Sequence, residues 1–244
     1  MIGSAPDPLI TVAATLAVSY LVGSIPFAYV IVRTANGEDI TAHGTGNVGS
    51  MNVRRTTGSW WLFALAVVGD GLKGLAPTFI AKLALGGGVG AWGFALRPWG
   101  VTLARVDSAW WTNPVFFVPM AAVAGCVLGH NYSLWMAIIK RRFTRTGKGL
   151  ATGAGALLAY DWRYLVVVLA VALAVIAVTH YMMAGQVAAA FALPVAALMF
   201  RSPDWPFAFV MGALVYLAHH KRFVGLLRGR EPKLYVDDGA GPRG

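Results

Sequence analysis

The stretch LITVAATLAVSYLVGSIPFAYVIV, residues 9–32, contains no Asp, Glu, Lys or Arg. A helix that spans the hydrocarbon core of a bilayer needs ~20 consecutive apolar residues, so this run is long enough to cross a membrane. Further uncharged runs occupy residues 114–139, 164–181 and 181–200. The sequence therefore predicts an all-α, polytopic membrane protein.

The composition agrees with this class. Apolar residues make up 57% of the chain and charged residues only 12%, about half the ~25% of a soluble domain. A formal charge of +10 could indicate nucleic-acid binding, but the basic residues concentrate at helix ends, as anionic lipid headgroups and the positive-inside rule favour. Because no polar segment is long enough to bury a core, we expect residues 1–244 to form a single membrane domain with a disordered tail at 233–244. Cys126 is the only cysteine and lies in an apolar run, so we expect it to serve packing.

Charge also predicts the orientation in the membrane. Asp7 is the only charged residue before Arg33, so the basic flank follows the first helix and the N-terminus should lie outside. The segment 150–160 is short for a crossing and could instead re-enter the membrane. Counting it as a crossing puts the C-terminus and the two basic segments, 140–148 and 221–233, in the cytoplasm. The seven expected crossings lie near residues 9–32 (bent at Pro26), 60–82, 114–139, 150–160, 162–180, 182–200 and 205–219, with an external connection at 84–113.

The loop after the first crossing, HGTGNVGSMNVRRTTG at residues 43–58, has the composition of an anion site. Glycines allow successive backbone N–H groups to point into one concavity. Asn47 and Asn52 add amide donors, Thr45 adds a hydroxyl, and Arg54 or Arg55 adds a guanidinium suited to phosphate.

The cytoplasmic segment 140–149 repeats this chemistry in the sequence TGKG, which contains Gly147, Lys148 and Gly149. It is not a P-loop, because Leu150 follows Gly149 where that motif requires Ser or Thr. Two such loops on one face indicate two phosphates, or one phosphate bound from both sides. Each loop taken alone is equally compatible with a flexible connector.

Asp70 and Lys73 lie about one helical turn apart within the crossing at 60–82. Charges inside a crossing are costly, so they face the protein interior, a cavity or a partner. Either they form a mutual ion pair or they serve a site.

Several signatures are missing from the sequence. The ten acidic residues are scattered, without the closely spaced aspartates that hold Mg²⁺. The H-x-x-x-x-D signature of CoA-dependent acyltransferases and the G-x-S-x-G elbow are also absent. We therefore expect an enzyme to act by positioning and by electrostatic stabilisation, without a metal.

Three separated regions resemble the acyl-phosphate-dependent glycerol-3-phosphate acyltransferases of the PlsY type. The first is GSIPFAYVIVRTANGEDITAHGTGNVGSMNVRRTTG followed by GDGLKG, close to that family's G-S-I-P, H-G-S-G-N-x-G-A-T-N-x-x-R and G-D-x-x-K-G. The second, GHNYS with TGKGLATGAGALL, is similar to G-H-x-F-P and F-K-G-G-K-G-V-A-T. The third, HHKRFVGLLRGREPK, is similar to R-H-R-x-N-I-x-R-L-x-x-G-x-E.

The resemblance implies an enzyme of the bacterial plasma membrane that faces the cytoplasm and acts as a monomer. It would transfer an acyl group from acyl phosphate to the 1-hydroxyl of glycerol 3-phosphate, giving 1-acylglycerol 3-phosphate, without metal or CoA. Arg55 would correspond to the family's phosphate-binding arginine, and Thr45 stands where the family has serine. The implied catalytic residues are Thr45, Asn47, Lys148 and His219, and the implied substrate-binding residues are Gly44, Gly46, Gly49, Asn52, Arg55, Asp70, Lys73, His130, Gly147, Gly149, Arg222 and Glu231.

The chain also departs from the family pattern. Met51 replaces a threonine, Met183 in HYMMAGQ replaces a substrate-contacting serine, and Arg222 replaces an asparagine. RRFTRTGKG also differs from the family's FKGGKG. Each lost hydrogen bond should cost about 1–3 kcal/mol if a ligand group is left unpaired, while Arg222 adds a cation suited to phosphate. Two alternatives follow: an acyltransferase with another phosphorylated acceptor, or a transporter or binding protein for an anion or lipid phosphate.

Overall fold

The computed structural model describes residues 7–85, 116–202 and 204–231, and all regular secondary structure in these ranges is helical. The chain divides into two compact units, Met1–Trp162 and Arg163–Gly244. The expected external connection lies almost entirely outside the described residues, as does the expected tail at 233–244.

The first crossing consists of two helices, α1 (Pro8–Gly23) and α2 (Phe27–Asn36), so the expected single helix bent at Pro26 is broken instead. Pro26 lacks a backbone N–H and precedes α2 directly. Asp7 begins α1 by accepting a 2.7 Å hydrogen bond from the N–H of Leu9. Gly37 ends α2 in the left-handed conformation, with φ of 72°.

Residues 43–49, here called the opening loop, follow α2 and lie between the 3-10 helix η1 (Ile40–Ala42) and α3 (Ser50–Thr57). Ile40, Val48 and Val53 are buried in one apolar cluster with residues of α2. The loop is therefore anchored at both ends and in its middle.

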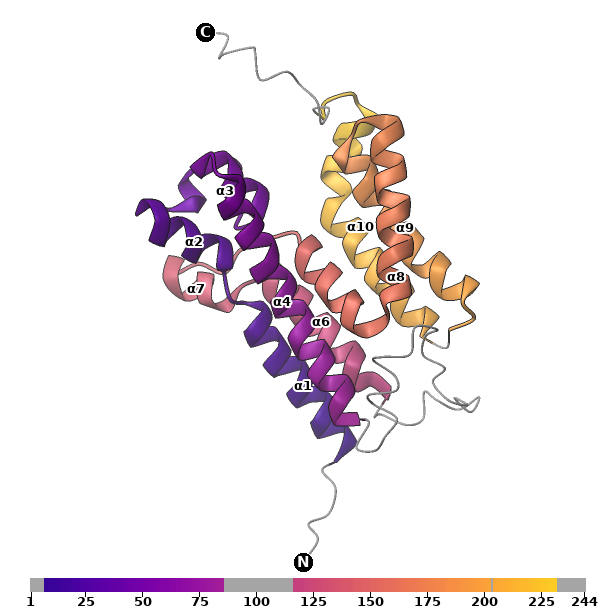
Figure 1. Cartoon of the computed structure of the whole chain (residues 1–244). Coiled ribbons are helices and arrows are strands. Elements are labelled where there is room, and N and C mark those ends of the chain that lie inside the picture. Colours follow the sequence, from indigo (N-terminus) through magenta and orange to yellow (C-terminus); the bar gives the residue numbers. More distant parts are fainter. Residues whose placement is uncertain (1–6, 86–115, 203, 232–244) are drawn as a thin grey trace, which may run out of the picture. The chain divides into compact units, whose positions relative to one another are not determined.

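Three long helices pack together in the first unit (Figure 1): α1, α4 (Trp60–Leu85) and α6 (Phe117–Asn131). Glycines allow their backbones to approach closely, as is common between membrane helices. A Cβ atom on Gly125 would meet the carbonyl of Leu16, and one on Gly23 would meet the backbone of Cys126. Cys126 is buried in this contact, as expected for a packing residue.

The third crossing is also broken. Helix α6 ends at Asn131, and α7 (Leu134–Lys140) follows after two residues. Ser133 begins α7 by accepting a 3.1 Å hydrogen bond from the N–H of Met136. The expected continuous crossing over 114–139 is thus two helices in its described part.

Helix α8 (Leu150–Thr179) contains one non-helical residue, Asp161, with φ of −157° and ψ of 107°. This residue divides the helix where the sequence predicts two segments, 150–160 and 162–180. Lys82 of α4 donates to the carbonyls of Ala159 and Tyr160 at 2.8 and 2.7 Å. These carbonyls would otherwise lack partners at the end of the first segment.

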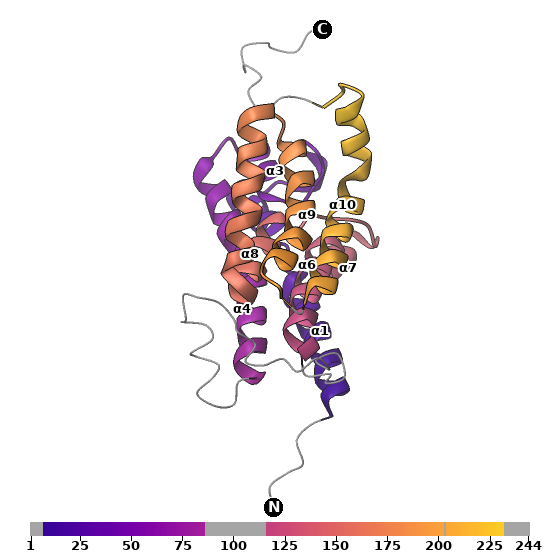
Figure 2. The same cartoon turned by 90° about the vertical axis from the view of Figure 1, so that its right-hand side faces the viewer.

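The second unit contains the rest of α8 together with α9 (Met182–Met199) and α10 (Trp205–Leu227). Helices α9 and α10 pack along one another (Figure 2), and Gly212 lies against the carbonyl of Ala190. The hydroxyl of Tyr164 donates to Asp204 at 2.7 Å, which ties the start of this half of α8 to the start of α10.

Five helical segments of the described chain are long and apolar enough to cross a membrane: Pro8–Asn36, Trp60–Leu83, Phe117–Lys140, Leu150–Thr179 and Met182–Met199. A shorter apolar segment covers Trp205–Leu217. Many of their large apolar side chains are exposed, including Val178 and Ile80 at 81% and 62%. The fold is that of a helical membrane protein, as the sequence predicts.

Candidate functional site

The two glycine-rich loops of the first unit are in direct contact. The N–H of Val48, in the opening loop, donates to the carbonyl of Thr146 at 2.8 Å. Val48 precedes the first turn of α3, and Thr146 precedes the first turn of α8. Segments that are far apart in the sequence therefore lie side by side, with two helix N-termini following them.

Asn52 determines the shape of the opening loop. Its amide nitrogen donates to the carbonyls of Ile40 and His43 at 3.1 and 3.0 Å, and its amide oxygen accepts from the N–H of Thr45 at 3.0 Å. Gly44 has φ of 55°, and a Cβ atom there would meet the Asn52 amide oxygen. The sequence suggests Asn52 as a donor to a bound phosphate, but in the structure both amide hydrogens serve the loop itself.

Two other polar residues of the opening loop are at least partly exposed. Thr45 is exposed and Asn47 is half-buried. Gly49 directly precedes helix α3, which therefore begins without a hydrogen bond from a capping side chain. The first N–H groups of a helix have no partner within it, so this end is suited to an anion.

The structure separates the two arginines that the sequence leaves as alternatives. Arg54 places its guanidinium 4.8 Å from the ring centre of Trp60. Arg55 is exposed, and its Cβ lies 3.6 Å from the position that a Cβ atom on Gly44 would take. Arg55 is therefore the arginine next to the glycine turn.

The second loop, residues 141–149 between α7 and α8, is held against α6. Gly147 lies so close to the ring and carbonyl of His130 that a Cβ atom would collide with both. Gly149 has φ of 75° and immediately precedes α8. Lys148 lies between these two glycines and is half-buried.

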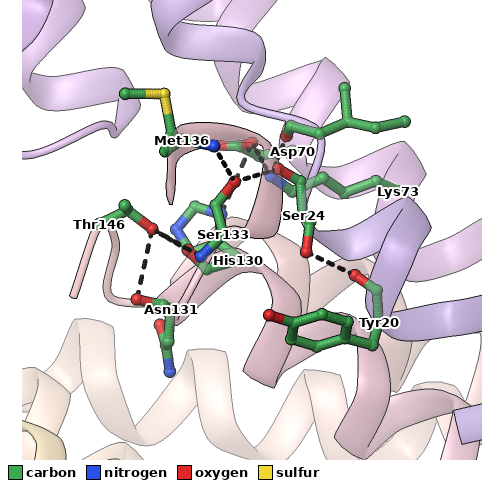
Figure 3. A network of polar contacts seen from close by, with 10 residues as sticks. Tyr20, Ser24, Asp70, Lys73, His130, Asn131, Ser133, Met136 and Thr146 are labelled. Carbon is green, nitrogen blue, oxygen red and sulfur yellow. Dashed lines mark hydrogen bonds and ion pairs between the residues drawn. The ribbon is translucent and has the colours of Figure 1, made fainter. Parts of the chain in front are cut away.

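A buried polar network lies beneath the second loop (Figure 3). Asp70 and Lys73 form an ion pair of 2.8 Å, and Lys73 also donates to the carbonyl of Ile25 at 2.7 Å. His130 places Nδ1 3.7 Å from the Asp70 carboxylate. Asp70, Lys73 and His130 are only 2%, 5% and 7% exposed as whole residues, respectively. Of the two interpretations of Asp70 and Lys73, the structure thus shows the ion pair, and it connects that pair to His130.

The two helix breaks face one another in the same region. Ser133 donates from Oγ to the carbonyl of Ser24 at 2.5 Å (Figure 3). Tyr20 donates from its hydroxyl to the carbonyl of Tyr132 at 2.8 Å. Neither Ser24 nor Ser133 is among the residues that the sequence predicts for the site. The only local signals are the motifs GSIP and NYS, which give no indication of this long-range contact.

The remaining predicted residues belong to the second unit. His219 lies with Nδ1 2.8 Å from the carbonyl of Val215. Arg222 and Glu231, both expected to bind substrate, bind one another through two hydrogen bonds of 3.0 and 2.5 Å. Met183 is 2% exposed. Among the described residues of the whole chain, no three His, Cys, Asp or Glu side chains are grouped so that they could hold a metal ion.

Comparison with known proteins gives a consistent result. A family model described as glycerol-3-phosphate acyltransferase matches residues 13–229. The glycerol-3-phosphate acyltransferase of Thermosynechococcus vestitus is 32% identical, over 91% of this chain and 94% of its own. Glycerol-3-phosphate acyltransferase 2 of Moorella thermoacetica is 35% identical, over 90% of this chain and 95% of its own.

Solved structures are also similar. The crystal structure of PlsY (YgiH), an integral membrane glycerol 3-phosphate acyltransferase, in its glycerol 3-phosphate form has a TM-score of 0.69 and 27% identity. Its lysophosphatidic acid form has a TM-score of 0.68 and 26% identity, and both comparisons cover 91% of this chain and 94% of PlsY. The chain belongs to the glycerol-3-phosphate acyltransferase family.

Proposed function

We propose that this protein transfers an acyl group from acyl phosphate to the 1-hydroxyl of glycerol 3-phosphate. The observation that carries the proposal is the contact between the two glycine-rich loops, made by Val48 and Thr146. It puts two helix N-termini, Arg55 and Lys148 in the same part of a membrane-embedded unit. PlsY structures in glycerol 3-phosphate and lysophosphatidic acid forms support the acceptor and the product.

The proposed reaction is a direct transfer without metal or CoA. The acceptor hydroxyl oxygen attacks the acyl carbonyl carbon, and a new ester bond forms. The bond between that carbon and the phosphate oxygen breaks, and inorganic phosphate leaves. Loop N–H groups stabilise the negative charge that develops on the carbonyl oxygen. The hydroxyl proton passes to the leaving phosphate or to a histidine acting as general base, a role that we propose for His219.

Each loop has a role in this proposal. The donor phosphate binds at the first turn of α3 and at Lys148, where Thr45, Asn47 and the flanking glycines supply further donors. Arg55 binds the acceptor phosphate through its planar guanidinium. Asp70, Lys73 and His130 act from beneath by holding the second loop.

Within the second unit, we propose His219 and Arg222 as further phosphate-binding residues, as the family resemblance implies. Arg222 would then exchange its carboxylate partner Glu231 for phosphate, or share the two. The energetic cost of this exchange is modest, because the Arg222 side chain is 46% exposed.

We further propose seven membrane crossings, with the N-terminus outside and the C-terminus in the cytoplasm. The extended backbone at Asp161 supports a division of α8 into two crossings. The basic residues of 140–148 and 221–233 would then both face the cytoplasm, in agreement with the positive-inside rule. The protein would act as a monomer in the bacterial plasma membrane, with residues 1–244 as one functional domain and its active site toward the cytoplasm.

An ester-formation assay tests the function. Purified protein receives palmitoyl phosphate with glycerol 3-phosphate, and in separate reactions with other phosphorylated alcohols, without added metal or CoA. We expect lysophosphatidate from the first reaction. Product only from another acceptor would indicate that Met51, Met183 and Arg222 change the specificity. No ester from any acceptor, in protein shown to be folded, would refute the enzymatic proposal and favour anion binding or transport.

Two variants test the assignment within the site. Lys148→Ala should lower the rate by roughly 100-fold or more, as expected for loss of a cation that stabilises transferring phosphate and oxyanion charge. Arg142→Ala is the matched control, because it removes an exposed cation from the same segment. Equal rates for both variants would remove Lys148 from the proposed mechanism.

A further inference from the structure

We propose that Thr146 is a positioning residue that fixes the two substrate loops relative to one another. It does so by closing the break between α6 and α7 and by holding Val48 at the same time. The inference rests on the proposed function, since it concerns where that function's two loops are held. Thr146 itself contacts neither of the proposed substrates.

The first contact is with the end of α6. The last carbonyl groups of a helix have no partner within the helix. Thr146 supplies partners for two of them: its N–H donates to Asn131 at 2.8 Å, and its Oγ1 donates to His130 at 2.9 Å. The Asn131 carbonyl lies 3.3 Å from Oγ1 as a second acceptor. Thr146 thus ends α6 from a distant part of the sequence (Figure 3).

The second contact is with the start of α7. The Oγ1 of Thr146 accepts from the N–H of Ser133 at 3.3 Å. Ser133 in turn begins α7 and donates to the carbonyl of Ser24. A single hydroxyl group therefore serves both sides of the helix break, as donor to α6 and as acceptor for the first residue before α7.

The third contact is with the opening loop. The carbonyl of Thr146 accepts from the N–H of Val48, whose side chain is 5% exposed in the apolar cluster beneath α3. The backbone N–H, the carbonyl and the hydroxyl of Thr146 are all engaged. Lys148 is two residues further along the chain, and the first turn of α3 begins two residues after Val48. Any shift of Thr146 therefore moves Lys148 relative to that turn.

A small displacement at this point should affect catalysis more than stability. Loss of one half-buried hydroxyl removes the hydrogen bond that it donates to His130 and the one that it accepts from Ser133, but leaves the helices and their apolar contacts in place. Reacting groups, by contrast, must be held within a narrow range of separations, and a misplacement of about 1 Å can lower a rate about 100-fold. We therefore expect the effect in kcat, with each substrate still bound.

The experiment compares three variants in the ester-formation assay. Thr146→Val keeps the shape but removes the hydroxyl, and Thr146→Ser keeps the hydroxyl. Thr144→Val is the matched control, because it makes the same change at an exposed threonine of the same segment. We expect Thr146→Val to lower kcat by about 10- to 100-fold while each KM changes less than about threefold. Thr146→Ser and Thr144→Val should both stay within about threefold of wild type in kcat.

Hydrogen exchange gives a second measurement that does not depend on activity. The N–H of Val48 is protected by its bond to Thr146, so Thr146→Val should speed exchange in peptides that contain residues 47–49. Thr146→Ser should not. Hydrogen exchange still tests whether Thr146 positions the two loops if the wild-type protein forms no ester. The absence of ester would refute the proposed function alone.

Two results would overturn the inference. One is a Thr146→Val variant of an active wild type with unchanged kcat and unchanged exchange at 47–49. The other is a lowered thermal midpoint with a normal kcat for the folded fraction, which would give Thr146 a purely structural role. Equal loss in Thr146→Val and Thr146→Ser would also count against it, since the hydroxyl would not be the group that acts.

Discussion

Asn52 shows how one side chain can determine a loop that other residues use. Its carboxamide satisfies two carbonyls and one N–H of the opening loop, and the residue is 2% exposed. The neighbouring Asn47 is half-buried and follows the turn of Gly46. The two asparagines look equivalent in the sequence, yet one shapes the loop, whereas the other is the one that we propose to bind substrate.

Substitution separates these two roles. Asn52→Asp removes both amide donors, and each carbonyl left unpaired costs about 1–3 kcal/mol. We expect its thermal midpoint in detergent to fall by about 2–4 °C per kcal/mol lost. Asn47→Ala should leave the midpoint near that of wild type and lower only the rate of ester formation. Similar midpoints for the two variants would contradict the distinction.

Gly147 offers a second test at the residue scale. Gly147→Ala would force a methyl group into the ring and carbonyl of buried His130, and overpacking of this kind costs about 1–3 kcal/mol. We expect a lower thermal midpoint and reduced acyl transfer. Gly153→Ala is the control, since the nearest atom to its Cβ is 4.0 Å away, on Val127. In a helix, alanine is favoured over glycine by about 1 kcal/mol, so this control should be as stable as wild type or more so.

At the scale of the elements, the Asp70–Lys73 pair explains how α4 carries two charges through the protein interior. Lys73 is also bound by the carbonyl of Ile25, which the break between α1 and α2 leaves without a helical partner. The same pair holds the carboxylate toward His130, whose ring supports Gly147. One turn of α4 therefore supports the second loop.

Removing one charge of the pair should lower the stability of the protein more than removing both. Asp70→Asn leaves Lys73 as a buried charge without its carboxylate, which costs about 3–5 kcal/mol. The double variant Asp70→Asn with Lys73→Met should recover most of that stability, as measured by thermal unfolding. Full recovery of stability without recovery of acyl transfer would indicate that the pair contacts substrate directly. Recovery of both would confine it to support.

The elements also show what sequence can and cannot predict. Uncharged runs identify the long apolar helices, and Pro26 correctly marks a discontinuity, although the structure has a break where a bend is expected. The glycine, amide and cationic residues predict two anion-binding loops. The contact between these loops cannot be predicted in this way, because the carbonyl of Thr146 accepts a hydrogen bond from Val48, which lies in a distant part of the chain. The partner of Arg54 is hidden for a different reason: Trp60 is near in sequence, but the guanidinium lies over its ring only because the chain turns between α3 and α4.

At the scale of the whole molecule, the proposed orientation requires an odd number of crossings. Cys126 is buried and is the only cysteine, so Cys126→Ala gives a background for single-cysteine labelling. In intact cells, Asp7→Cys should react with a membrane-impermeant maleimide. Arg230→Cys should react only after permeabilisation. Labelling of both positions from the same side would require an even number of crossings and would exclude seven.

The hydrogen bond from Ser133 to the carbonyl of Ser24 also has a consequence for biosynthesis. These residues are 109 positions apart, so at ~5–20 residues per second the ribosome adds Ser133 roughly 5–20 s after Ser24. During that interval the gap in the first span lacks this donor, in a solvent that offers few others. The first span therefore gains this bond only after more than half of the chain has been synthesised, and until then the carbonyl of Ser24 depends on water or on the insertion machinery.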